Sequence, residues 1–175
     1  ADKKFFSFLD INGSQILNLK SPLIEKVIFR SCSIKKKVVE ADEKEIGIRK
    51  ILNFGHTFAH AYEATLRYSK NLNHGEAVIL GIKTAAKFSL SNNILNKKKF
   101  NLIENHLNKL GLPKNIKKFF STKDLNKILS FMKKDKKNNT KKINLVLLKN
   151  IGAPIYKLQF DVKKVNLFLR KELIK

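Results

Sequence analysis

Apolar residues recur at spacings of three and four along most of this chain, and this spacing limits its fold more than any other feature. Between positions 97 and 110 it is followed by Phe100, Ile103, Leu107 and Leu110. Residues so spaced share one face of an α-helix, and Gly111 and Pro113 then end that helix. The same pattern predicts further helices at 22–38, 49–66, 75–90, 122–132 and from 162 onward.

Only one region predicts β-structure. INLVLLK at 143–149 and IYKLQF at 155–160 are short apolar runs separated by a turn that contains Gly152 and Pro154. The basic run at 133–142 is predicted to be a loop. No internal repeat and no domain boundary is visible, so all 175 residues are expected to form one domain. The predicted fold is mainly α, a multi-helical domain with a small β-hairpin near its end.

The strong positive charge invites a nucleic-acid-binding interpretation. Lys and Arg number 37 against 14 Asp and Glu, which gives a net charge of +23. Only Arg30, Arg49, Arg67 and Arg170 are Arg, although phosphate and base recognition favours the planar guanidinium. The lysines are spread along the whole chain together with many Asn and Ile, as AT-rich coding produces. No specific nucleic-acid partner is therefore expected, although such a charge favours non-specific binding at low salt.

The sequence also indicates the compartment. No run of about 18 uncharged apolar residues occurs, so no membrane span and no membrane partner is predicted. The N-terminal ADKKFFSFLD lacks the features of a signal peptide. The single Cys32 rules out a disulfide framework and fits a reducing, cytoplasmic location. The first residue is not Met, so a fragment or a processed chain is expected.

Three of the four histidines lie within RKILNFGHTFAHAYEATLRYSKNLNHGEAV at 49–78. His56 and His60 are four residues apart, which places them on one face of a helix. His74 follows after a polar turn and can fold back against that face. Neutral imidazoles in this arrangement suit a divalent cation such as Zn²⁺. His106 stands alone in a helix of structural character.

Two further polar side chains extend the histidine face towards the N-terminus. Asn53 and Arg49 precede His56 by three and seven residues, so on one continuous helix they would form a polar stripe with the histidines. The other sides of that helix are apolar. A polar line on a buried helix is costly unless it borders a cleft, so the stripe predicts a substrate site.

These residues resemble the 3-dehydroquinate synthase family. The signature DE-x-E-x-G-x-R-x-x-LN-x-GHT-x-x-H is present at 42–60, and LNHGEAVILGIKTAA follows at 72–86. The similarity also covers SPLIEKVIFRSCSIKKKVV, GLP, DKK and NLVLLKNIG, and therefore the whole chain. One departure is Ala59, where the family usually has Gly.

The resemblance implies an enzyme that uses a metal and NAD. In this family a Zn²⁺ ion, or Co²⁺ in its place, is held by two His and one Glu. The two His correspond to His56 and His74, whereas His60 corresponds to a histidine that lines the substrate pocket. NAD⁺ first oxidises a substrate hydroxyl, phosphate is then eliminated, and the hydride is returned before the ring closes.

The resemblance also implies a substrate and its contacts. The family converts 3-deoxy-D-arabino-heptulosonate 7-phosphate into 3-dehydroquinate and phosphate, in the shikimate pathway of aromatic amino acid biosynthesis. Lys35, Arg49 and Asn53 correspond to residues that contact the carboxylate, hydroxyls or phosphate. A lysine of the DKK run adds a further contact, and Lys136 is preferred for it.

Two parts of such an enzyme are not found in this sequence. The third zinc ligand of the family lies in an upstream Glu-x-x-Lys helix, and the NAD-binding domain lies further upstream. No Gly-rich phosphate loop occurs at 1–175. The chain is therefore expected to be the C-terminal metal- and substrate-binding domain, inactive alone and part of a homodimer when complete.

Three other functions remain open on this sequence. A sister sugar-phosphate cyclase would apply the same chemistry to another sugar phosphate. A metal-dependent polyol or alcohol dehydrogenase would have a similar histidine-rich helix without needing cations beside the metal. A non-catalytic basic helical domain would bind nucleic acid.

Overall fold

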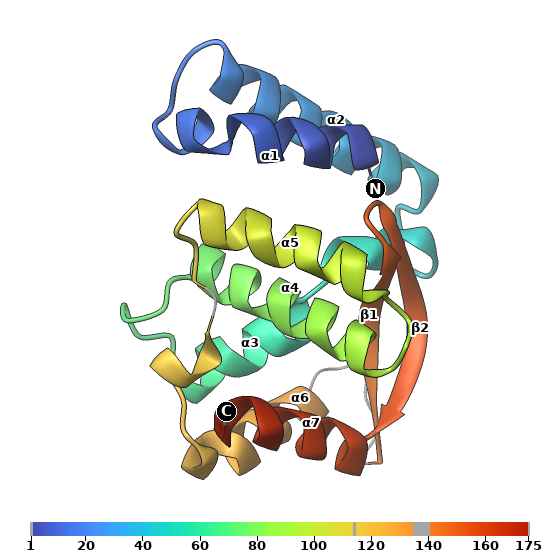
Figure 1. Cartoon of the computed structure of the whole chain (residues 1–175). Helices are drawn as coiled ribbons and strands as arrows, with labels where there is room; N and C mark the ends of the chain where they lie inside the picture. The colour runs from blue at the N-terminus through green and yellow to red at the C-terminus, as the bar shows by residue number, and fades with distance from the viewer. Residues whose placement is uncertain (1, 114, 135–140, 175) are drawn as a thin grey trace.

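A computed structural model describes residues 2–113, 115–134 and 141–174. Figure 1 shows a mostly helical chain with one long β-hairpin along its side, in agreement with the predicted fold class. The α-helices in these ranges are α1 (Lys3–Leu17), α2 (Leu23–Ala41), α3 (His56–Thr65), α4 (His74–Ser91), α5 (Lys97–Lys109), α6 (Leu125–Lys134) and α7 (Val162–Ile174). Short 3₁₀ helices are η1 (Ile48–Asn53), η2 (Ile116–Lys118) and η3 (Thr122–Asp124).

The hairpin consists of β1 (Lys142–Asn150) and β2 (Ala153–Asp161), paired antiparallel. Leu145 pairs with Leu158 and Leu147 with Ile155. One residue of β1 is therefore opposite two residues of β2, Tyr156 and Lys157, which is a β-bulge. The predicted strands are confirmed, but the turn is shorter than predicted, because Pro154 already belongs to β2. The sequence does not predict the bulge.

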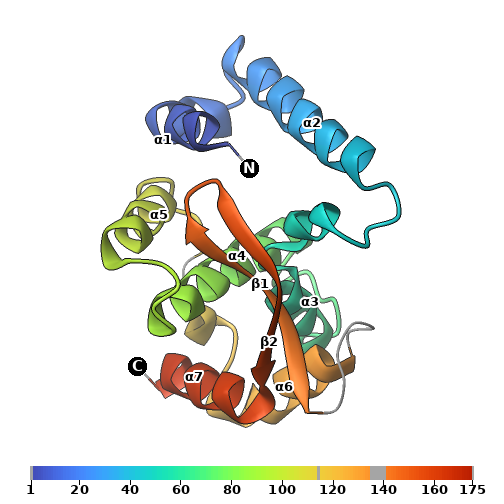
Figure 2. The ribbon, with the colours of Figure 1, turned by 90° about the vertical axis from the view of Figure 1, so that its right-hand side faces the viewer.

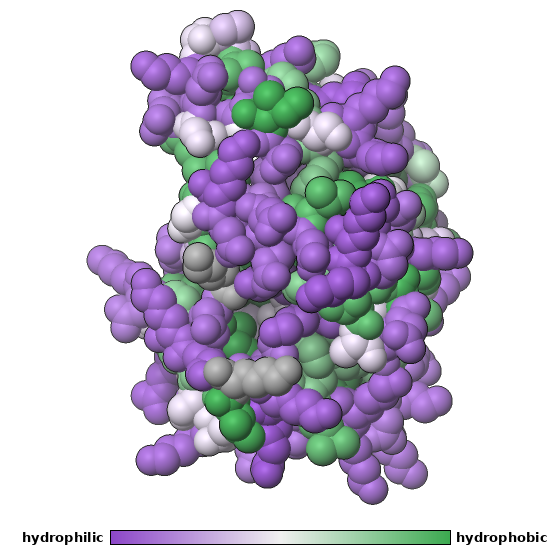
Figure 3. Space-filling view, in the orientation of Figure 1, coloured by the Kyte–Doolittle hydropathy of each residue, from purple (hydrophilic) through white to green (hydrophobic). Residues whose placement is uncertain are grey.

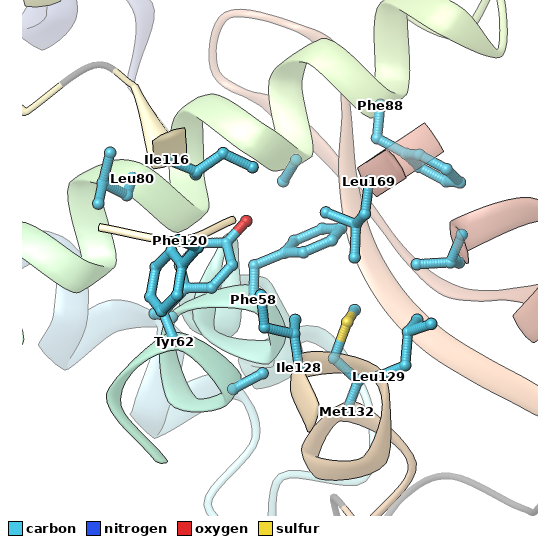
Figure 4. Close-up of a cluster of buried hydrophobic side chains, with 14 of the residues drawn as sticks. Phe58, Tyr62, Leu80, Phe88, Ile116, Phe120, Ile128, Leu129, Met132 and Leu169 are labelled. Atoms are coloured by element: carbon cyan, nitrogen blue, oxygen red, sulfur yellow. The ribbon is translucent and has the colours of Figure 1, made fainter. Parts of the chain in front are cut away.

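The core lies where α3, α4, α6, α7 and the inner face of the hairpin meet. Figure 4 shows the aromatic and aliphatic side chains that fill it, among them Phe58, Tyr62, Phe88, Ile128 and Leu169. These side chains are at most 1% exposed. The Tyr62 hydroxyl is 3.0 Å from the Thr84 hydroxyl, so its buried polar atom is satisfied. This core fixes α3 and α4, which carry the three clustered histidines.

The first two helices stand apart from this core. Figure 2 shows α1 and α2 as a separate pair above the rest of the domain. α2 buries none of its residues, and α1 buries only Gly13. Contacts to the main body include the His106 ring, whose Nδ1 is 2.9 Å from Asp10 Oδ1 and which packs on Phe6. This agrees with the structural role predicted for His106.

The continuous helix predicted for 49–66 is wrong. η1 ends at Asn53, Gly55 has φ +84°, and a new helix begins at His56. A Cβ added to Gly55 would lie 2.5 Å from the Ile82 backbone nitrogen, because α3 begins where its backbone crosses α4. Arg49 and Asn53 therefore do not share a helical stripe with the histidines, and their positions come from the turn instead.

The crossing of α3 and α4 gives a stability prediction. A methyl group on Gly81 would collide with the Gly55 carbonyl oxygen, which is rigid backbone. We expect Gly81→Ala to lower the free energy of unfolding of this chain by about 3 kcal/mol or more in urea. Gly75→Ala is the control on the same helix, since its Cβ would meet only Asn73 Oδ1 at 3.5 Å. It should be neutral or slightly stabilising, and equal effects of the two variants would contradict this account.

Three other boundaries differ from the sequence prediction. α1 was not predicted, and α2 begins at Leu23 rather than at position 22, since its N-cap is Pro22 and no side chain caps it. The basic run predicted as a loop begins inside α6, and positions 135–140 lie outside the described residues. Lys136 falls in this range.

The surface carries the high charge in a dispersed form. Figure 3 shows hydrophilic side chains spread over the face from α1 to α7, with apolar side chains between them. Several lysine ammonium groups form ion pairs with carboxylates, as Lys83 does with Glu104 on α5 and Lys87 does with Glu172 on α7. Within the described residues, no helix has the length and hydrophobicity that a membrane span requires.

Candidate metal and substrate site

The three clustered histidines meet at the point where α3 and α4 begin. His56 is the first residue of α3, His60 is one turn further on, and His74 is the first residue of α4. The centroid distances are 5.5 Å for His56–His60, 6.3 Å for His56–His74 and 6.5 Å for His60–His74. The sequence prediction that His74 folds back towards the α3 face is confirmed.

Local sequence explains why both helices start at a histidine. Gly55 takes the left-handed conformation that lets the chain turn into α3. Asn73 caps α4, accepting a hydrogen bond from the Glu76 backbone nitrogen, while the Glu76 side chain accepts from the Asn73 nitrogen. The two turns therefore hold His56 and His74 at neighbouring helix ends.

His56 has the environment of a neutral imidazole. Burial lowers its pKa, and the neighbouring His60 and His74 lower it further, against an opposing contact with the Phe54 carbonyl. Nδ1 is 3.4 Å from that carbonyl oxygen. A neutral ring keeps a nitrogen lone pair for a metal ion, which is the form that Zn²⁺ binds.

The clustered histidines supply only part of the ligand set that a divalent ion such as Zn²⁺ needs. A ring centroid lies about 3 Å from a Zn²⁺ ion that its nitrogen binds, so two rings share an ion at separations up to about 6 Å. His56 and His74 are close to this limit. Among residues 2–113, 115–134 and 141–174, no group of three or more His, Cys, Asp or Glu side chains is placed so that it could hold a metal ion. The described residues thus bring three imidazole rings together, with centroids 5.5–6.5 Å apart.

Two adjoining cavities border the histidines. One, of about 390 Å³, is lined by Lys35, Arg49, Asn53 and His56, with residues of α2 and η1 between them. The other, of about 750 Å³, lies between α3 and the hairpin, and includes Asn53, His56 and His60. Asn53, His56 and Glu45 line both cavities. Apart from Lys136, the structure thus brings the residues chosen from the sequence to one region.

Glu45 holds Asn53 in place. The Asn53 side-chain nitrogen donates to Glu45 Oε1 at 2.7 Å. This fixes which way the amide points, since its nitrogen faces the carboxylate and its oxygen remains for another donor. The sequence contains Glu45 within the family signature, but it was not chosen as a site residue.

The hairpin forms one side of the larger cavity, and the sequence did not predict this. Asn144, Tyr156, Lys157 and Gln159 line the larger cavity opposite the histidines. Lys157 has φ +65°, a conformation that is unusual for a residue other than glycine, and it occupies the bulge of β2. No sequence signal marks these residues, because the register of a bulge depends on the partner strand.

Asp42 organises the turn that carries Arg49. Its carboxylate accepts backbone hydrogen bonds from Ile46, Gly47 and Arg49 at 2.8–3.1 Å. The Arg49 guanidinium donates to the Glu43 carbonyl oxygen, within the same turn. The hydrogen bond from the Arg49 backbone nitrogen, followed by those from Gly47 and Ile46, lowers the pKa of Asp42 below 3.8.

This lowered pKa gives a pH-dependent prediction. A carboxylate with a depressed pKa in the folded state stabilises the fold above pH 3.8, and the contribution is lost as pH falls through the folded-state value. Asp42→Asn should therefore unfold at a lower urea concentration than the unchanged chain near neutral pH. The gap between their midpoints should close below pH 3.8. A gap that stays constant down to low pH would show that the charge of Asp42 does not act through the turn.

Comparison with known sequences identifies the family. The sequence profile described as "3-dehydroquinate synthase C-terminal" matches residues 1–138. A 3-dehydroquinate synthase of Pelagibacter ubique is 73% identical over 99% of this chain and 47% of that protein. One of Thermodesulfovibrio yellowstonii is 40% identical over 92% of this chain and 43% of that protein. The chain thus spans about half the length of these curated relatives.

Comparison with solved structures supports the same architecture. A 2-epi-5-epi-valiolone synthase of Streptomyces hygroscopicus, solved with NAD⁺ and Zn²⁺ bound, has a TM-score of 0.79 over 97% of this chain and 46% of that one, at 17% identity. A 2-deoxy-scyllo-inosose synthase, solved with carbaglucose-6-phosphate, NAD⁺ and Co²⁺, has a TM-score of 0.71 over 89% of this chain and 44% of that one, at 25% identity. With the profile match and the close relatives, these likenesses lead to one conclusion: the chain belongs to the 3-dehydroquinate synthase family, to its C-terminal domain.

Proposed function

We propose that this chain is the metal- and substrate-binding half of an enzyme that converts 3-deoxy-D-arabino-heptulosonate 7-phosphate into 3-dehydroquinate and phosphate. The observation that carries the proposal is the pair of cavities that share His56 and Asn53. They join a histidine cluster suited to a metal with the two cations Lys35 and Arg49. A sugar acid phosphate needs both kinds of group at once.

His56 and His74 would hold the metal in this proposal. A divalent ion bound there would polarise a hydroxyl and a carbonyl oxygen of the substrate. NAD⁺, bound mainly by the other half of the protein, would accept and return a hydride. The metal ion, the NAD⁺ and the homodimeric state of the complete protein are proposals that rest on the resemblance to the family.

The chain's own residues would bind and orient the substrate. Lys35 and Arg49 carry charges that neutralise phosphate and carboxylate, and the guanidinium can do so with two parallel hydrogen bonds. Asn53, fixed by Glu45, offers its amide oxygen to a substrate hydroxyl. His60 lies exposed at the cavity and can take or give a proton at a substrate oxygen through a ring nitrogen. Lys136 would add a cation from positions outside the described residues.

A substrate comparison tests the proposal. Residues 1–175 are joined to the N-terminal half of the Pelagibacter ubique relative, which is 73% identical over the shared part; this is called the joined protein below. With NAD⁺ and Zn²⁺, it should release phosphate from the heptulosonate phosphate and form 3-dehydroquinate. Glucose 6-phosphate is the matched control, as a phosphorylated sugar without the carboxylate.

A sister sugar-phosphate cyclase is the second candidate, because both solved neighbours described above are such enzymes. It predicts the reverse pattern of substrates. A joined protein that folds and binds NAD⁺ but releases phosphate only from a sugar without a carboxylate would favour the sister cyclase and overturn the proposal.

A further inference from the structure

We propose that Glu63 positions His74 for metal binding: its carboxylate accepts the Nδ1–H of that ring and leaves Nε2 as the nitrogen that binds the ion. The inference rests on the metal centre of the proposed function and deepens it. The observation behind it is a side-chain contact, with His74 Nδ1 3.0 Å from Glu63 Oε1.

The Glu63 carboxylate is buried, and a buried carboxylate needs a partner. It lies on α3 and is only 8% exposed, in a segment where Phe58 and Tyr62 are also buried. A buried carboxylate is costly unless charged or hydrogen-bonding partners compensate for the lost water. Its hydrogen-bond partner in the described structure is His74. A buried acid on the core side of a histidine cluster is therefore anchored to the cluster itself.

The chemistry of the pair fixes the tautomer. An ionised carboxylate can only accept hydrogen bonds, so the hydrogen in this contact must be on Nδ1 of His74. In a neutral imidazole the lone pair is then on Nε2, and that nitrogen can bind a metal. Carboxylate–histidine–metal arrangements of this type hold the ring orientation and raise the basicity of the ligand.

The exposure of His74 makes this anchor important. The His74 side chain is 63% exposed, and it belongs to the first turn of α4. Without an anchor the ring would sample several rotamers, and binding a metal would have to order it.

The test separates positioning from direct ligation. In the joined protein, Glu63→Leu removes the acceptor while filling the space, whereas Glu63→Gln keeps an oxygen that accepts from Nδ1. Glu172→Gln is the matched control, since its side chain is similarly buried, at 15% against 11%, and pairs with Lys87. Zn²⁺ affinity is measured by competition with a chelator, and folding is checked by thermal unfolding.

We expect Glu63→Leu to weaken Zn²⁺ binding by about 10- to 100-fold. Glu63→Gln should weaken Zn²⁺ binding by less than about a third as much as Glu63→Leu, when the changes are compared as logarithms of the dissociation constant. Glu172→Gln should bind Zn²⁺ as tightly as the unchanged protein does. Unchanged affinity in Glu63→Leu would overturn the proposal. Equal losses in Glu63→Leu and Glu63→Gln would also overturn it, because they would make Glu63 itself a ligand.

A second measurement does not depend on the variants or on the metal. Two-bond ¹H–¹⁵N correlation spectra of residues 1–175 report which nitrogen of His74 carries the hydrogen. The Nδ1–H form is expected, and a dominant Nε2–H form would overturn the proposal even if Glu63→Leu does not fold. If the unchanged joined protein binds no Zn²⁺ while His74 is in the Nδ1–H form, the proposed metal centre fails and the Glu63 contact stands.

Discussion

Alanine in place of His56 or His74 is expected to lower phosphate release by the joined protein by about 10³-fold or more. The physical reason is the ligand count. Zinc sites need at least three protein ligands, and the chain supplies two of them in this account. Loss of either His would release the ion and with it several kcal/mol of transition-state stabilisation, at 1.36 kcal/mol for each factor of ten. Steady-state phosphate release and bound zinc, measured on the same samples, check the prediction.

His106→Ala is the control for these two variants. His106 pairs with Asp10 and packs on Phe6, and it lines neither of the two cavities described above. Its loss should reduce stability slightly, by about 1 kcal/mol, and leave kcat within a factor of two. Turnover above a tenth of the unchanged value in either His56→Ala or His74→Ala would contradict the assigned roles.

Residues 1–175 alone, supplied with NAD⁺ and Zn²⁺, are expected to form no measurable 3-dehydroquinate. The reaction needs a hydride acceptor, a metal with three ligands, cations for the phosphate and carboxylate, and a site closed to water. This chain offers the cations and two of the ligands. It covers about half of its curated relatives, at 47% and 43% of their lengths, so the other requirements are assigned to the remaining half.

Mixing the chain with the separate N-terminal half of the relative should restore activity. The matched control is the same mixture with His56→Ala, which should stay inactive although the halves associate. Turnover by residues 1–175 alone, at a rate comparable with the joined protein, would contradict the division of the site between two halves.

Much of the fold could be predicted from local patterns. The hairpin and the helices α4, α5 and α7 follow from apolar periodicity and from caps such as Asp161, which accepts from the Lys163 nitrogen. The start of α3 could not be predicted from apolar periodicity or caps. The break at Gly55 arises from the close approach of α4, a tertiary contact that helical periodicity across 49–66 does not contain. The helix at Lys3–Leu17 was not predicted at all.

Apart from Lys136, the residues of the candidate site were predicted correctly to lie together, but part of the reason given was wrong. A helical stripe was expected to align Arg49 and Asn53 with the histidines, but η1 and α3 are separate elements. The turn organised by Asp42 and the Glu45–Asn53 hydrogen bond bring these side chains to the cavities instead. Such contacts join residues four to eight positions apart across the turn between α2 and η1, where no single helical period applies. Glu63 was missed for a related reason, since its partner His74 belongs to another helix.

The most direct test of the account measures zinc and turnover together in the joined protein. A chelator removes the metal in steps, and phosphate release from the heptulosonate phosphate is recorded at each step with NAD⁺ present. The account predicts that turnover falls in proportion to bound Zn²⁺, approaches zero with the metal removed, and returns when Zn²⁺ or Co²⁺ is added back. Full turnover with less than about a tenth of an ion per chain would contradict it.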